Sequence, residues 1–140
     1  MSSDQQERAE LFEAFSKVYS LAETRGARRD WFGRVGGRGL HLRSASPPLL
    51  QRVSIALAHL KSRRIEPDLT ICIWEGPLPR LLGSFVSDLE HQHYLRLDSR
   101  HEIPWLRDDR FAGSYRLGPD VHVLSLLDRQ NRKALYWVED

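Results

Sequence analysis

The sequence predicts a single α+β domain over residues 1–140, with a mostly antiparallel sheet and two main helices packed on one face of it. Three observations predict this class. Two stretches in the first half of the chain have apolar residues at helical spacing, several short stretches in the second half have the patterns of strands, and 140 residues is an ordinary size for one domain. Helices followed by a run of strands are typical of α+β folds.

The first predicted helix covers residues 4–23. Asp4 and Glu7 have the spacing of a capping box, and apolar residues then recur every three or four positions. Gly26 ends the helix, and the arginine-rich residues up to Asp30 are expected to form a connecting loop.

The second predicted helix covers residues 47–63. Ser46 is suited to the N-cap, and Pro47 to a first-turn position where its missing N–H costs nothing. Four apolar residues then form a stripe at helical spacing: Leu50, Val53, Leu57 and Leu60.

Five stretches have the patterns of strands. They are residues 38–43, 69–75, 111–117, 121–127 and 134–138. The stretch 69–75 is apolar on both faces, which predicts a central strand, and the last two stretches flank a polar connection of hairpin length. If the first two strands are parallel neighbours, the helix between them should make a right-handed crossover.

Three further stretches carry weaker signals. Residues 76–92 fit either a short helix or a strand, because the segment GPLPRLLG breaks any regular period. Residues 94–98 alternate between polar and apolar side chains, which favours a strand, and residues 118–120 read Gly-Pro-Asp, which predicts a turn.

The glycine-rich stretch WFGRVGGRGLHLRS, residues 31–44, has the composition of a phosphate-binding loop but not its spacing. A P-loop ends in Gly-Lys followed by Ser or Thr, and this stretch contains no Gly-Lys pair. A dinucleotide-binding fingerprint also fails, because Leu42 occupies the position of the third glycine and a strand follows in place of a helix. The favoured interpretation is a tight turn in which Gly36 and Gly37 supply positive φ angles.

The segment 25–64 is strongly basic, with ten basic side chains and one acidic side chain, although the net charge of the whole chain is only +2. Five arginines are predicted to bind a partner: Arg28, Arg29, Arg34, Arg38 and Arg43. Trp31 and Phe32 lie among them, which also fits an independent nucleic-acid-binding module that stacks bases. The nearly balanced total charge favours an acidic protein surface over nucleic acid.

A metal-dependent enzyme is the third hypothesis. It rests on His91, His93 and Asp98, which lie in a segment with several potential metal ligands. No HExxH motif or similar ligand spacing is present there, so a solvated polar surface is the favoured interpretation and neither a metal nor a cofactor is expected.

No nucleophile motif is present either. Ser84 and Ser114 lack the Gly-x-Ser-x-Gly pattern, and Cys72 lies within a predicted strand. The sequence therefore predicts a binding protein with no catalytic residues.

The sequence also predicts a cytoplasmic protein without membrane contact. No stretch approaches the ~18 uncharged apolar residues of a membrane-spanning helix, and the first ten residues carry acids where a signal peptide carries bases. The single cysteine fits a reducing compartment.

Two blocks carry a resemblance to a known family: DLTICIWE at residues 68–75 and VLSLLDRQNRKALYWVED at residues 123–140. Both resemble segments in the N-terminal region of bacterial proteins related to HPr serine kinase, where similar sequence precedes a P-loop kinase domain. The resemblance implies a non-catalytic recognition or scaffolding domain that binds a protein or peptide partner, for example at a sheet edge. A kinase domain in the same chain is one such partner.

This chain has no P-loop, so the resemblance transfers no catalytic residue to it. The last seven residues, ALYWVED, read as an apolar strand with almost no polar tail. The sequence-based expectation is therefore that the natural chain continues past Asp140 and that this segment is an N-terminal accessory domain.

Overall fold

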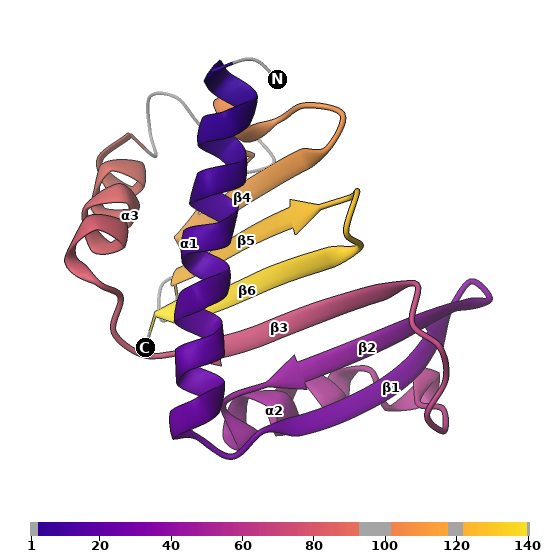
Figure 1. Ribbon diagram of the computed structural model, residues 1–140. Coiled ribbons are helices and arrows are strands. Elements are labelled where there is room, and N and C mark those ends of the chain that lie inside the picture. Colours follow the sequence, from indigo (N-terminus) through magenta and orange to yellow (C-terminus); the bar gives the residue numbers. More distant parts are fainter. Residues whose placement is uncertain (1–2, 93–101, 118–121, 140) are drawn as a thin grey trace.

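A computed structural model describes residues 3–92, 102–117 and 122–139. Its centre is a six-stranded sheet in the order β1-β2-β3-β6-β5-β4 (Figure 1). The strands are β1 (Arg29–Val35), β2 (Arg38–Ser44), β3 (Leu69–Glu75), β4 (Phe111–Leu117), β5 (His122–Asp128) and β6 (Lys133–Glu139). The helices are α1 (Ser3–Arg25), α2 (Pro47–Ala56) and α3 (Arg80–Gln92), with short 3-10 turns at Ala58–Leu60 and Pro104–Leu106.

The predicted α+β class and mostly antiparallel sheet are confirmed. Three strand pairs are antiparallel, namely β1–β2, β4–β5 and β5–β6. The two pairs that involve β3 are parallel. The chain therefore combines antiparallel hairpins at both sides of the sheet with a parallel centre.

Helix α1 crosses the strands on one face of the sheet (Figure 1). Its inward-facing aromatic residues, Phe12, Phe15 and Tyr19, are buried. The ring of Tyr19 meets that of Trp74 on β3 edge to face, with 5.6 Å between ring centroids. Burial of an apolar side chain of this size stabilises the fold by about 2–3 kcal/mol relative to exposure, so α1 is an integral part of the domain.

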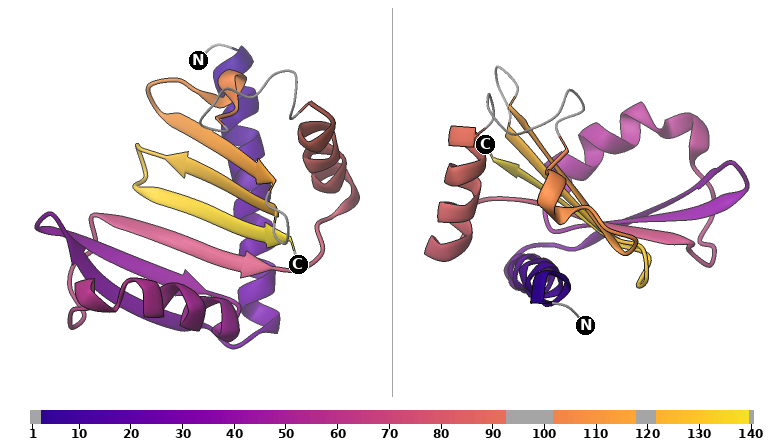
Figure 2. Two further views of the ribbon diagram at one scale, coloured as in Figure 1. Left: turned by 180° about the vertical axis from the view of Figure 1, so that it is seen from behind. Right: turned by 90° about the horizontal axis from the view of Figure 1, so that it is seen from above.

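Helix α2 lies on the opposite face from α1 and α3, which corrects the expectation of two main helices on one face (Figure 2). Leu49 and Leu50 of α2 pack in a separate cluster with Leu42 and Ile73, whereas α1 and α3 share the larger cluster of the other face. The helical periodicity of residues 47–63 indicates that one side of the helix is buried, but it carries no information about which face of the sheet buries it.

The connection from β2 through α2 to β3 is left-handed. The two strands are parallel neighbours, so the condition for the expected right-handed crossover is met and the expectation is wrong. In Figure 1, α1 lies toward the viewer, β2 and β3 both point to the left, and β2 lies below β3. Helix α2 runs behind the sheet in this view, as the view from behind in Figure 2 shows. If Figure 1 is turned so that β3 points upward, β2 lies to the left of β3, with α2 still behind the sheet. A right-handed connection would place α2 on the face that α1 and α3 already cover.

Strand β3 is central and buried on both faces, as its sequence predicted. Ile71 and Ile73 face the cluster that contains α2, and Cys72 and Trp74 face the cluster that contains α1. Both faces of the sheet thus depend on this strand.

Strand β1 was expected to be a loop up to Asp30 followed by the glycine-rich turn. It forms a hairpin with β2 whose turn residues Gly36 and Gly37 have φ angles of 57° and 80°, so the predicted positive-φ turn is confirmed. Gly33 explains why the sequence did not indicate this strand. Its position faces inward, but the ring of Trp31 leaves no room for a side chain there, so a glycine breaks the apolar alternation.

The predicted helix 47–63 ends early, at Ala56. The residues beyond the 3-10 turn pair with the edge of β1, through a bridge between Gly33 and Lys61 and a bond of 2.9 Å from the Ser62 amide to the Phe32 carbonyl. This pairing competes with further helical turns, because the same backbone groups cannot serve both.

The other stretches agree with the sequence where the structure describes them. The strands predicted at 111–117 and 134–138 are confirmed, the strand predicted at 121–127 is confirmed from His122 onward, and the ambiguous stretch 76–92 contains helix α3. The strand expected at 94–98 and the turn expected at 118–120 lie outside the described residues.

A short segment pairs with each edge strand of the sheet. On β1 the bridge joins Gly33 and Lys61, and on β4 it joins Glu102 and Ser114. These bridges occupy part of the edge that a peptide would need in order to add a strand. In the described ranges, no helix is long and apolar enough to cross a membrane.

The carboxylate of Asp128 organises the turn between β5 and β6. It accepts two hydrogen bonds from the Arg110 guanidinium, at 2.9 and 3.0 Å, and others from the Gln130 amide and the Asn131 side chain. Its side chain is only 1% exposed, so these bonds replace its hydration.

We expect Asp128→Ala to lower the free energy of unfolding by about 3 kcal/mol, because it leaves Arg110 and the turn amides without their acceptor. Urea denaturation followed by circular dichroism measures the change. The exposed Asp109→Ala serves as the control and should change stability by less than about 0.5 kcal/mol. Equal stabilities of the two variants would contradict this account of the turn.

Candidate functional site

The structure divides the five predicted binding arginines into two groups. Arg28 and Arg43 belong to an ion network at the C-terminal end of α1, whereas Arg29, Arg34 and Arg38 are exposed on the β1–β2 hairpin. The five do not form one site.

Two acidic residues hold the ion network together. Arg43 Nη2 donates to both carboxylate oxygens of Glu23, at 2.8 and 2.9 Å, and Arg28 Nη1 lies 3.3 Å from Glu23 Oε1. Asp30 binds Arg28 at 3.0 Å and the ring of His41 at 2.7 Å. This network joins α1 to strands β1 and β2, and it neutralises the two arginines that it contains.

The pKa values of both acids reflect this arrangement. Burial opposes ionisation of Glu23, but its hydrogen bonds and ion pair with Arg43 outweigh burial and hold the pKa below its usual range. Asp30 behaves in the same way, since bonds from His41 and Arg28 outweigh its burial and lower its pKa.

A second group of basic side chains gathers at the turn end of the β1–β2 hairpin, and we call it the basic end. It consists of Arg34, Arg38, Lys61, Arg63 and Arg64, all exposed. The pairing of residues 61 and 62 with β1 brings the last three beside the hairpin. Within the described part of the chain, none of these five has an acidic partner within 4 Å.

Two acids lie close to the basic end in the sequence before β3. Asp68 accepts a hydrogen bond of 2.7 Å from the amide of Gly39, so its carboxylate is engaged at the start of β2. Glu66 is exposed. Five basic and two acidic side chains leave this end of the molecule with an excess of positive charge.

An aromatic pair lies beside the basic end, on the face of the sheet that carries α1. Phe32 and His41 are directly opposite each other on β1 and β2, and their rings stack with centroids 4.4 Å apart and planes 7° apart. The guanidinium carbon of Arg64 lies 5.9 Å from the centroid of the Phe32 ring. The aromatic ring therefore helps to hold the Arg64 cation at the surface.

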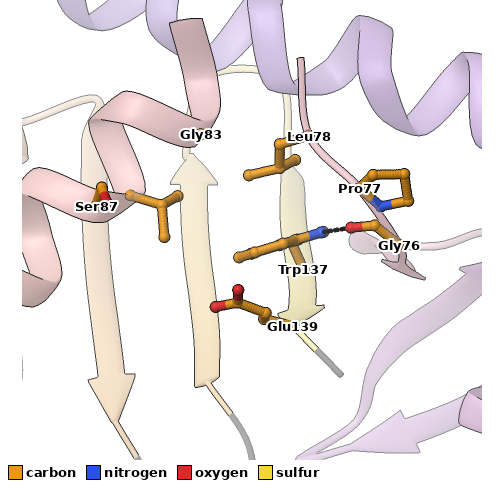
Figure 3. A pocket seen from close by; sticks show the side chains of 8 residues that line it. Gly76, Pro77, Leu78, Gly83, Ser87, Trp137 and Glu139 are labelled. Carbon is orange, nitrogen blue, oxygen red and sulfur yellow. Dashed lines mark hydrogen bonds between the residues drawn. The ribbon is translucent and has the colours of Figure 1, made fainter. Parts of the chain in front are cut away.

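A cavity opens where β3 and β6 end, beside α3 (Figure 3). It is lined by Gly76, Pro77 and Leu78 after β3, by Gly83, Val86 and Ser87 of α3, and by Trp137 and Glu139 of β6. The indole Nε1 of Trp137 donates a hydrogen bond of 3.0 Å to the Gly76 carbonyl, which fixes the ring (Figure 3).

The metal hypothesis falls largely outside the described residues. His93 and Asp98 are not described, and His91 belongs to the last turn of α3. Among the residues that the structure describes, no group of three or more His, Cys, Asp or Glu side chains could hold a metal ion.

Sequence reasoning found part of the basic end and missed the cavity. The charge of segment 25–64 includes Lys61, Arg63 and Arg64, but a helix predicted as far as residue 63 gave no reason to place them beside β1. The cavity combines a loop, a helix and a strand that are distant in sequence. Its local signal is the Gly76-Pro77 step directly after a buried strand.

No protein-family model matches the chain, and no curated protein or solved structure shows significant similarity to it.

We expect Glu23→Gln to weaken the dependence of stability on acidic pH. Because Glu23 has a lowered pKa in the folded state, it contributes stability above its unfolded pKa, and this contribution is lost as the pH falls through the folded pKa. Urea denaturation between pH 7 and pH 3 should show a smaller loss of stability for this variant than for the wild type. The exposed Glu13→Gln, on the same helix, should retain the wild-type slope, and a wild-type slope for Glu23→Gln would contradict the assignment.

Proposed function

We propose that this domain is a recognition or scaffolding module that binds the acidic surface of a protein or peptide partner through its basic end. The observation that carries the proposal is the group of five exposed cations at one end of the sheet, none of which has an acidic partner within 4 Å among the residues that the structure describes. Four of the five are arginines, which bind carboxylates through two parallel hydrogen bonds. Such a surface attracts an acidic partner from a distance and then fixes its orientation.

The division of the arginines supports this choice of surface. Arg28 and Arg43 already bind Glu23, so a partner that used them would first have to break the contacts of α1. Arg34 and Arg64 have no ion pair with a described acidic residue that would have to be broken. Within the basic segment 25–64, the basic end is therefore the part that a partner can bind without breaking existing ion pairs.

Nucleic-acid binding is a second candidate, favoured by the Phe32–His41 pair beside the cations. Base stacking needs a free aromatic face, and the Phe32 ring is already in contact with His41 and Arg64. This occupation makes an acidic protein surface the preferred partner.

The resemblance to N-terminal regions of HPr serine kinase-related proteins suggests one partner, a kinase domain in the same chain. In that case the domain would position the kinase domain or its substrate and would act by binding alone. This assignment is part of the proposal and rests on the two quoted sequence blocks.

We expect the double variant Arg34→Glu/Arg64→Glu to lose at least tenfold in affinity for a fluorescein-labelled decaglutamate peptide, because it replaces two attractive charges by two repulsive ones. Fluorescence anisotropy at 50 mM salt measures binding. Wild-type affinity should fall as salt rises, since the binding groups are exposed. Arg116→Glu, an exposed arginine on β4, serves as the control with the same type of charge change and should bind like the wild type.

A labelled decathymidylate of the same length distinguishes the two candidates. Tighter binding of the peptide than of the oligonucleotide supports the protein partner. Tighter binding of the oligonucleotide, with loss in the double variant, would replace it by the nucleic-acid function. Equal binding by the double variant and Arg116→Glu would exclude the basic end in both cases.

A further inference from the structure

The cavity at the ends of β3 and β6 offers hydrogen-bond acceptors and no basic side chain among its described lining residues. Its acceptors are the carboxylate of Glu139, the carbonyl of Gly76 and the hydroxyl of Ser87. Gly76 accepts the bond from Trp137, but a carbonyl oxygen has two lone pairs and retains one. The polar groups of the cavity are therefore suited to a ligand that donates hydrogen bonds.

Glu139 supplies a negative charge at this position. Its side chain is 45% exposed, and one carboxylate oxygen, Oε2, accepts a hydrogen bond of 2.9 Å from Nδ1 of His122, the residue opposite it on β5. This bond holds the carboxylate through Oε2. A positively charged group is the natural complement.

Another part of the cavity wall is formed by an aromatic ring and by apolar side chains. Figure 3 shows the indole of Trp137 nearly edge-on, between Leu78 on one side and the carboxylate of Glu139 on the other. An aromatic ring next to a carboxylate attracts a cation through both the ring quadrupole and the full charge. Leu78 and Val86 provide contacts for a short apolar arm.

Glycine at position 83 keeps the cavity open. A Cβ atom built at Gly83 meets no other atom within 4 Å, so no neighbour requires a glycine there for lack of space. Glycine in the interior of a helix costs about 1 kcal/mol relative to alanine. This cost brings no packing benefit, but it leaves the wall of the cavity without a side chain.

We propose that this cavity binds an ammonium or guanidinium group on a short apolar arm, the chemistry of a lysine or arginine side chain. The cation lies between the Glu139 carboxylate and the Trp137 indole, and the arm contacts Leu78 and Val86. This site is separate from the basic end, and it takes a ligand of the opposite charge.

The proposal is tested with n-butylammonium, a free amine, and with N-acetyl-lysine-N-methylamide, which carries the same group on a peptide unit. The ¹⁵N-labelled protein is titrated at constant ionic strength, and the indole N–H resonance of Trp137 is followed after assignment with Trp137→Phe. Both ligands should shift this resonance in a saturable manner with millimolar Kd values. Butyrate and n-butanol, which have the same number of carbon atoms but no cation, should not.

Two variants locate the binding. Glu139→Gln keeps the size of the side chain and should weaken n-butylammonium at least fivefold. Gly83→Leu should fill the cavity and abolish the shift, whereas Gly83→Ala, the matched control, should keep the fold and most of the binding. The double variant Arg34→Glu/Arg64→Glu should bind the amine as the wild type does, so the two proposals fail independently.

Three results would overturn the proposal: a shift of equal size with butyrate, unchanged affinity in Glu139→Gln, or no saturable shift with either amine up to 100 mM. Binding of the lysine derivative but not of n-butylammonium would still support the site and would identify a protein side chain as its ligand. The reverse preference would identify a free amine.

Discussion

Strand β3 must be covered on both faces, and the arrangement of the helices follows from this requirement. Isoleucines point to one side of the strand, and Cys72 and Trp74 point to the other. Exposure of either face to water would cost about 25 cal/mol of folding free energy for each Å² of apolar surface, and each face carries several large apolar side chains. Helix α1 covers one side with its aromatic residues, and α2 must then cover the other even though this requires a left-handed connection. Burial of both faces thus outweighs the usual preference for right-handed crossovers.

The sequence predicted the elements better than it predicted their assembly. The apolar stripe of α1, the doubly apolar β3 and the C-terminal hairpin are local patterns, and each appears at the expected place. The helix begins at Ser3, so Asp4 lies within its first turn. The face that α2 covers depends on where α1 lies, and no local pattern records this. Strand β1 escaped detection because Gly33 breaks its alternation, although the glycine is needed under the ring of Trp31. The early end of α2 likewise depends on a distant partner, the edge of β1.

The candidate site shows the same limit of local reasoning. A run of arginines indicates positive charge, but it does not indicate which charges remain available. Glu23, twenty residues before Arg43 in the chain, neutralises part of the charge of the basic segment. Lys61 and Arg64, which follow α2 in the chain, lie beside β1 and add to the positive charge there. Only the folded arrangement separates arginines that anchor α1 from arginines that face solvent.

The position of the single thiol has a consequence for chemical labelling. Cys72 is 1% exposed beneath α1, and burial raises the pKa of its thiol, so both access and thiolate character are low in the folded state. Any reagent that modifies this sulfur must therefore wait for α1 to lift from β3 or for the whole domain to unfold. The rate of alkylation reports the opening of the helix layer without any engineered probe, and a modified Cys72 marks a molecule in which that layer has opened.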